Sequence, residues 1–235
     1  MQISTAHLPR LRIAMQSNEW FKHCSEEFQS TLVSMGQIRK LRDGEVLKEE
    51  GKTASGLWCV LAGRGRVHHT VGNKTQLVRD YMPYDWMGEV SLIDNVPSSL
   101  STTAFGETTL MEIDRDVLLQ WLEEYPVYWR DFARLVSFRF RYGSAMFNQA
   151  THLGLKERLL QRLYLISAGY GMGSHLARRI RYSQQELADM LGVSRPCISI
   201  ELGKLAEQGI LELRYGEIYL LKLQETSHHQ GVCQP

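Results

Sequence analysis

The chain has 235 residues, of which 43% are hydrophobic and 23% are charged, and its formal net charge is +1. This composition is typical of a soluble globular protein, and the length suits one large domain or two modest ones. No apolar run approaches the ~18 residues of a membrane span, and the N-terminus lacks the apolar core of a signal peptide. We therefore expect a cytoplasmic protein with no membrane partner.

The four cysteines, Cys24, Cys59, Cys197 and Cys233, lie far apart and include no C-x-x-C spacing. This pattern supports neither a zinc site nor a disulfide framework. We expect reduced thiols and no bound metal.

In chain order, residues 1–35 are predicted to be a helical lead-in, because large apolar side chains recur there at roughly helical intervals. Between residues 38 and 113 the pattern changes to short strand-like segments, separated by turn residues such as Asp43-Gly44. Short strands at even spacing predict an antiparallel barrel or jelly roll. A barrel of that size has room for one small ligand.

A long helix is predicted from Pro126 to about residue 150. One apolar stripe fits the a and d positions of a heptad and consists of Ala133, Val136, Phe140, Gly143, Phe147 and Ala150. A second apolar side is formed by Trp129, Phe132, Leu135 and Phe138. Such a stripe can pack inside its own domain, but two apolar sides favour one side against the barrel and one against a second copy of the chain. We therefore expect a homodimer.

The segment that begins at Ser183 has the pattern of a helix-turn-helix. Ser183 and Glu186 fit a capping box at the start of the first helix, and Gly192 is suited to end that helix. Ser194 is placed to cap the second helix, with Pro196 in its first turn, where a missing N–H loses no hydrogen bond. Two short helices joined by a glycine turn can place the second helix in a DNA major groove.

After the second helix, residues 209–214 and 217–220 alternate in polarity across Tyr215-Gly216, which predicts a hairpin and so a winged helix. Paired helices also occur in proteins that never touch nucleic acid. Here, however, Arg195 at the start of the second helix favours phosphate and guanine edges. The excess of positive charge also lies in residues 153–222. We therefore predict that this part of the chain binds double-stranded DNA.

The order of these parts resembles the cyclic-AMP receptor protein family of bacterial transcription regulators, the Crp/Fnr family. The resemblance covers about residues 20–222 and is carried by residues 63–67, by Gly88-Glu89-Val90-Ser91-Leu92, by Pro126 and by residues 187–199. It implies an α+β fold with an N-terminal β-roll (a jelly roll) similar to cyclic-nucleotide-binding domains, a long dimerisation helix and a C-terminal winged helix-turn-helix. The implied domains are the β-roll with its lead-in at 1–125, the dimerisation helix at 126–152, the DNA-binding domain at 153–224 and a disordered tail at 225–235.

Family members that bind a cyclic nucleotide hold its phosphate and ribose with a Gly-Glu pair and an Arg-Ser pair. The second pair falls here on Ser99-Leu100, and serine replaces the charge-assisted bonds of an arginine poorly, which argues against ordinary cyclic-AMP binding. The effector-binding residues that the resemblance implies are Gly88, Glu89, Val90, Ser98, Ser99, Arg139 and Ser144. A cyclic nucleotide, a cyclic dinucleotide and no effector at all stay open as alternatives. A lone Cys24 cannot hold an iron–sulfur cluster.

At the DNA, the resemblance implies base contacts from three positions of the second helix. Arg195 matches an arginine that contacts guanine, Pro196 replaces an acid, and Ile200 replaces a second arginine and favours a thymine methyl group. The whole predicted DNA surface is Ser183, Gln185, Ser194, Arg195, Pro196, Ser199, Ile200 and Lys204. The implied site is a palindromic promoter sequence, and RNA polymerase is a further partner that the resemblance implies.

Two other classes of function are weighed against a regulator. A cyclic-nucleotide or cyclic-dinucleotide sensor module could use its winged helix for protein contacts instead of DNA. An enzyme is not expected, because the glycine-rich segment 169–173 follows a predicted helix and not the strand that a phosphate loop requires. The pairs His68-His69 and His228-His229 lack partners in any metal-ligand spacing, and no catalytic residue is predicted.

Overall fold

The computed structural model describes residues 7–72, 74–173 and 176–223. The chain forms two compact units, residues 1–137 and 138–235, and the boundary between them falls within the long helix α6 (Trp129–His152). The predicted disordered tail at 225–235 lies outside the described residues.

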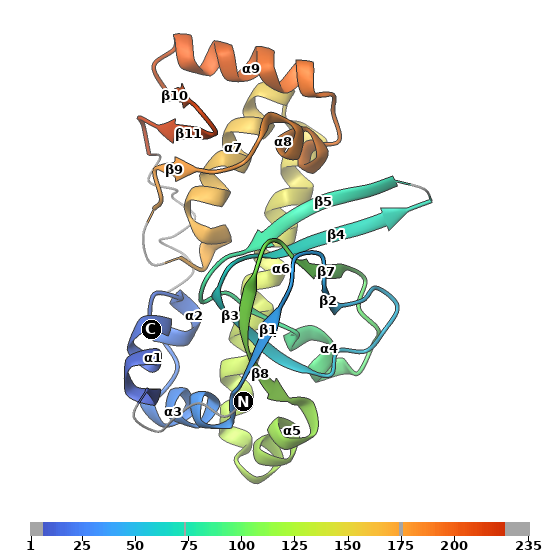
Figure 1. Ribbon diagram of the computed structural model, residues 1–235, viewed down its shortest axis with the longest axis vertical. Coiled ribbons are helices and arrows are strands. Elements are labelled where there is room, and N and C mark those ends of the chain that lie inside the picture. The colour runs from blue at the N-terminus through green and yellow to red at the C-terminus, as the bar shows by residue number, and fades with distance from the viewer. Residues whose placement is uncertain (1–6, 73, 174–175, 224–235) are drawn as a thin grey trace. The chain divides into compact units, whose positions relative to one another are not determined.

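The first unit begins with three short helices that lead into a β-roll (Figure 1). Polar side chains fix two of the helix starts: Asn18 accepts a hydrogen bond from the Phe21 N–H at 3.1 Å, and Ser25 accepts one from the Phe28 N–H at 3.2 Å. Caps of this kind stabilise a helix by about 1 kcal/mol. The helices of this unit before α6 are α1 (Leu8–Met15), α2 (Glu19–Lys22), α3 (Glu26–Met35), α4 (Glu89–Asp94) and α5 (Arg115–Glu124).

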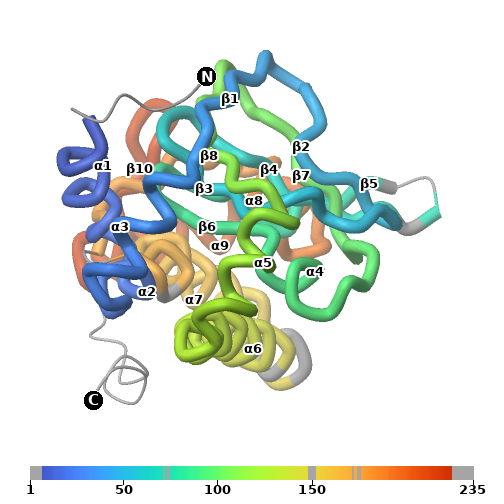
Figure 2. The backbone as a smooth tube through the Cα atoms, turned by 90° about the horizontal axis from the view of Figure 1, so that it is seen from below, coloured from blue at the N-terminus to red at the C-terminus, as the bar shows by residue number. Residues whose placement is uncertain are grey.

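The roll consists of two antiparallel sheets, which confirms the predicted β-roll. The strand order is β1-β8-β3-β6 in one sheet and β2-β7-β4-β5 in the other, and Figure 2 shows β1, β8 and β3 next to one another. The strands are β1 (Gln37–Leu41), β2 (Val46–Lys48), β3 (Gly56–Ala62), β4 (Gly65–Val71), β5 (Lys74–Tyr81), β6 (Trp86–Met87), β7 (Ser101–Ala104) and β8 (Thr108–Asp114). Buried side chains of both sheets, among them Trp58, Val67 and Leu110, form a shared core.

A second apolar group ties the lead-in helices to the start of α6. The ring of Trp20 lies 5.3 Å from that of Trp86 and 6.1 Å from that of Phe132, measured between ring centroids. Its Nε1 donates a hydrogen bond to the Asp131 carbonyl at 2.6 Å. The second predicted apolar side of the long helix therefore packs here through Phe132, and Leu135 on the same side is also fully buried.

The long helix starts later than predicted. Pro126–Tyr128 (η1) form a 3-10 turn in which the Tyr128 N–H donates to the Tyr125 carbonyl at 3.2 Å. The prediction that the α-helix begins at Pro126 was therefore wrong, because the chain first makes a tighter turn of the kind often seen at helix ends.

The second unit contains a winged helix-turn-helix, as predicted. Besides the end of α6, its elements are α7 (Leu155–Ser167), η2 (Gly169–Gly171), β9 (Arg179–Ile180), α8 (Gln184–Leu191), α9 (Arg195–Glu207), β10 (Leu211–Arg214) and β11 (Glu217–Leu220). Strands β10 and β11 form the wing. Strand β9, which the sequence did not predict, adds a third strand by pairing with β11.

Candidate DNA-binding surface and effector site

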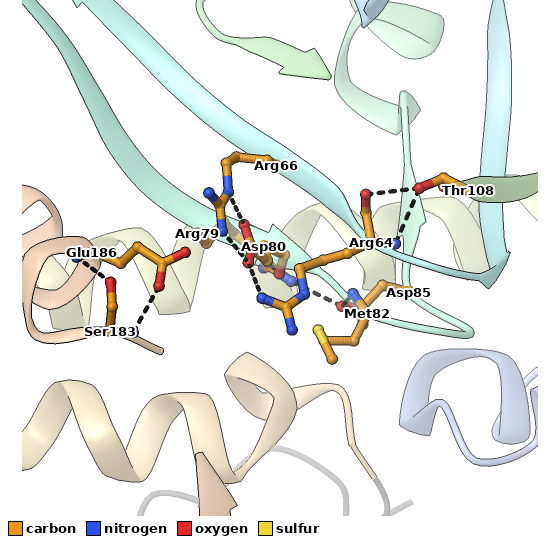
Figure 3. A network of polar contacts seen from close by, with 9 residues as sticks. All are labelled: Arg64, Arg66, Arg79, Asp80, Met82, Asp85, Thr108, Ser183 and Glu186. Carbon is orange, nitrogen blue, oxygen red and sulfur yellow. Dashed lines mark hydrogen bonds and ion pairs between the residues drawn. The ribbon is translucent and has the colours of Figure 1, made fainter. Parts of the chain in front are cut away.

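The first helix of the helix-turn-helix is held by a complete capping box. The Ser183 Oγ accepts a hydrogen bond from the Glu186 N–H at 3.2 Å, and the Glu186 carboxylate accepts one from the Ser183 N–H at 2.7 Å (Figure 3). Gly192 ends the helix with a φ of 67°, a conformation that favours glycine. Because both ends are fixed locally, the start of α9 is well positioned.

The inner and outer faces of α9 are clearly separated. Ile198, Leu202 and Leu205 are fully buried in the second unit. Every residue predicted to contact DNA is exposed, from Ser183 and Gln185 on α8 and its cap to Ile200 and Lys204 on α9. The structure thus brings the predicted DNA-contacting residues together on the surface of one unit.

Ser194 occupies the N-cap position of α9 but makes no capping hydrogen bond. Its Oγ lies instead 3.1 Å from the Sγ of Cys197. The prediction that the Ser194 side chain caps the helix was therefore wrong, because this hydroxyl is engaged with a thiol. The first backbone N–H groups of α9 have no side-chain cap at Ser194, and they carry the positive end of the helix dipole.

The cations near α9 differ in how they are held. Lys204 Nζ lies 2.7 Å from Glu201 Oε1, and the guanidinium of Arg214 on the wing lies 2.8 Å from Glu212. Arg195 is exposed and makes no ion pair with any residue that the structure describes. Its charge is therefore available to an external anion or base edge.

The predicted dimer stripe on α6 has large exposed apolar side chains: 74% of Phe140 and 69% of Phe147 is exposed. Gly143 lies between them, and within 4 Å a Cβ at that position would meet no described atom apart from its chain neighbours and the backbone of its own helix. Ala133 is exposed and Val136 is half-buried, whereas the side chain of Ala150 is not among those described. Since glycine inside a helix costs roughly 0.5–1 kcal/mol relative to alanine, packing within the described chain gives no reason for Gly143.

The expected effector-binding residues begin at Gly88, directly before α4. Gly88 has a φ of 103°, and a Cβ there would collide with the Gly56 carbonyl oxygen and lie 2.9 Å from the Trp58 ring. Glu89 is buried, with 3% of its surface exposed, whereas Val90 is exposed. The backbone at Gly88 therefore accepts only glycine without rearrangement.

Ser98 and Ser99, two of the expected effector-binding residues, have different surroundings. The Ser98 Oγ donates to the Leu100 carbonyl at 2.8 Å, so its hydroxyl is used within the loop, and Ser99 is exposed. Arg139 and Ser144 lie on α6 in the second unit and are half-buried. Their relation to Gly88 and Glu89 stays a prediction.

Three arginines of the roll, Arg64, Arg66 and Arg79, are engaged with carboxylates of the roll (Figure 3). Asp80 lies 3.2 Å from both Arg64 Nη1 and Arg66 Nε, and the buried Arg79 donates to Asp85 at 3.2 Å. The charges of these three guanidinium groups are therefore compensated by carboxylates of the roll itself.

This arginine network was not predicted from the sequence. Cross-strand pairing places Arg66 directly opposite Asp80, and opposite charges at such positions attract. The charges could have been matched once the register of the β4–β5 hairpin was known, but strand alternation alone does not set that register.

The thiols fall into two groups. Burial raises the pKa of the Cys24 and Cys59 thiols well above the ordinary value, whereas Cys197 on α9 is exposed. Buried protonated thiols react slowly. Among the described residues, no cluster of His, Cys, Asp and Glu could hold a metal ion, and none of the helices formed by them is both long and apolar enough to cross a membrane.

Two family models match the chain in sequence. The cyclic nucleotide-binding domain matches residues 38–125, and the Crp-like helix-turn-helix domain matches residues 157–225. These matches coincide with the roll of the first unit and the winged helix of the second.

Similar proteins span most of the chain. The CRP-like cAMP-activated global transcriptional regulator of Mycobacterium tuberculosis (strain CDC 1551 / Oshkosh) is 23% identical over 173 residues, which cover 72% of this chain and 77% of the relative. The Cyclic AMP receptor protein of Thermus thermophilus is 26% identical over 206 residues, which cover 87% of this chain and 93% of the relative. The solved structure of FixK2 from Bradyrhizobium japonicum matches with a TM-score of 0.69 at 19% identity and covers 85% of this chain and 98% of that chain. This match supports the fold.

Proposed function

The chain belongs to the Crp/Fnr family of transcription regulators, and on that basis we propose that it binds a palindromic promoter site as a homodimer. The observation that carries this proposal is the exposed guanidinium of Arg195 at the N-terminus of α9, next to neighbours that are all exposed. In this arrangement α9 enters the major groove, and Arg195 donates two hydrogen bonds to the O6 and N7 atoms of a guanine. Ser183, Gln185 and Ser194 contact the DNA backbone.

The homodimer forms through the apolar stripe of α6. Phe140 and Phe147 bury their exposed rings against the same stripe of a second copy, and Gly143 lets the two helices approach closely at the point between them. Two copies related by a two-fold axis place their recognition helices in half-sites about one helical turn (~34 Å) apart. RNA polymerase is a further partner of this regulator. The regulator acts in the cytoplasm.

The roll supplies regulation without requiring cyclic AMP. Ser99 stands where the phosphate-binding arginine is needed, and Arg64, Arg66 and Arg79 of the roll are engaged by Asp80 and Asp85. An effector bound in the roll near Glu89 would shift the paired α6 helices and change the spacing of the two recognition helices, because a ligand favours the conformation that it binds more tightly. A cyclic dinucleotide is the next effector class to test.

The test begins with selection of bound sequences from a random pool of double-stranded DNA. Enrichment of a two-fold palindrome is the expected result, and its absence would favour a module whose winged helix contacts proteins. Fluorescence anisotropy of the selected DNA, at fixed salt, is then titrated with protein with and without cyclic AMP. We expect the same affinity with and without cyclic AMP. A large gain in affinity with cyclic AMP would mean that the serine-rich segment 98–101 still holds a cyclic phosphate.

A further inference from the structure

One glycine in the interior of α9 has no structural explanation among the residues that the structure describes. Gly203 lies in the interior of α9, and within 4 Å a Cβ at that position would meet no described atom apart from its chain neighbours and the backbone of its own helix. Its φ is not among the positive values that require glycine. Alanine would therefore fit, and it would favour the helix, because glycine leaves the backbone more entropy to lose on folding.

The residues around Gly203 make this part of α9 narrow and uncharged. Ser199 and Ile200 precede Gly203 by four and three residues, so the three lie side by side on the helix surface. Of these, Ile200 is 59% exposed. The neighbouring Lys204 is tied to Glu201. We call Ser199, Ile200 and Gly203 the narrow face of α9.

We propose that the narrow face approaches the floor of the major groove and recognises thymine methyl groups there. This inference rests on the proposed DNA-binding function and specifies its sequence class. Thymine is the base that presents a methyl group in the major groove, and an apolar side chain is its natural partner. The missing Cβ at Gly203 removes the atom that would otherwise hold the helix away from the base edges.

The position of the thymine follows from helix geometry. Ile200 lies five residues after Arg195, which corresponds to about 7.5 Å along the helix axis. Base pairs are stacked about 3.4 Å apart along one strand. A helix that is inclined to the DNA axis projects at most this length onto it, so the thymine should lie within about two base pairs of the guanine that Arg195 contacts in each half-site.

The first test removes only the methyl group from the DNA. Each thymine of the selected palindrome is replaced in turn by deoxyuridine, and affinity is measured by fluorescence anisotropy at fixed salt. One position per half-site should weaken binding about fourfold, the change that corresponds to ~0.8 kcal/mol for one buried carbon group. In the variant Ile200→Ala this difference between thymine and deoxyuridine should disappear, whereas Val117→Ala, an exposed apolar truncation in the first unit, should preserve it.

The second test asks whether the backbone of α9 at Gly203 must lie close to the DNA. Gly203→Ala should raise the melting temperature slightly and still weaken binding of the selected DNA about tenfold, because overpacking a fitted contact costs affinity. If deoxyuridine is tolerated at every position, or if Gly203→Ala binds as well as the wild type, the inference is overturned while DNA binding stands. If no DNA sequence is selected, the proposed function itself fails, and the inference fails with it.

Discussion

Arg79 and Asp85 form a buried ion pair in the β-roll, with 3.2 Å between Nη2 and Oδ2 and with only 5% and 8% of the two side chains exposed. The same Asp85 oxygen accepts a hydrogen bond from the Met82 N–H at 2.9 Å. Asp85 therefore neutralises a buried guanidinium and fixes the turn between β5 and β6. The pair also compensates the charge of Arg79 inside the roll.

Replacement of Asp85 by asparagine should lower the free energy of unfolding by about 3–5 kcal/mol, because it leaves a buried guanidinium without its counter-charge. Urea denaturation followed by circular dichroism measures this change. The matched control is Glu49→Gln, which breaks an exposed pair with Lys52 and should change the stability by less than about 1 kcal/mol. An Asp85→Asn protein as stable as the control would show that Arg79 does not depend on this pair.

Phe140→Glu should convert the protein to monomers that bind the palindromic DNA weakly, because two copies of the new carboxylate would face each other across the proposed seam. Sedimentation velocity gives the oligomeric state, and anisotropy gives the affinity. Ile13→Glu, which places the same charge on an exposed apolar residue of α1, should remain dimeric. A Phe140→Glu protein that is fully dimeric and binds DNA normally would rule out the proposed interface.

Arg195→Ala should relax the base preference at one position of each half-site, with a loss of roughly 1–3 kcal/mol per contact. The measurement compares affinities for DNAs that differ only at that base pair. Arg181→Ala removes the same charge from an exposed residue of the same unit and should leave the base preference unchanged. Equal loss of affinity for all sequences in Arg195→Ala would instead identify Arg195 as a phosphate contact.

Cys197 should be the fast-reacting thiol among Cys24, Cys59 and Cys197, because burial raises the pKa of the other two. Alkylation by iodoacetamide, followed by mass spectrometry of a Cys233→Ser variant, measures the rate. Saturating palindromic DNA should slow the reaction strongly, since Cys197 lies in the first turn of α9. Unchanged alkylation in saturated complexes would mean that this turn does not face the DNA.

Local signals in the sequence predicted the helix-turn-helix well. The reciprocal bonds of Ser183 and Glu186, the left-handed Gly192 and the hairpin across Tyr215-Gly216 all occur as expected, because each depends on neighbours close in sequence. Ser194 was the exception. Its hydroxyl contacts the Cys197 thiol instead of a backbone N–H, and residue preferences alone do not predict which of these partners a serine takes.

Contacts between distant segments could not be predicted in the same way. The cluster of Trp20, Trp86 and Phe132 joins three elements that are far apart in sequence, and hydrophobic periodicity shows only that each side chain faces inward. The short strand β9 has two residues and carries no pattern of its own. In the effector region, the missing arginine was evident from the sequence, but the ion pair between Arg79 and Asp85 could be recognised only once the fold was known.

Gly143 and Gly203 suggest that this chain is not optimised for its own stability. Each lies in a helix where alanine would fit the described surroundings and strengthen the helix. A redesign that selects for heat resistance alone would replace both glycines first, and it would do so without any visible damage to the fold. The resulting protein would be more stable but, by the interfaces proposed above, a poorer regulator, because those interfaces place a second copy of the chain at Gly143 and DNA at Gly203.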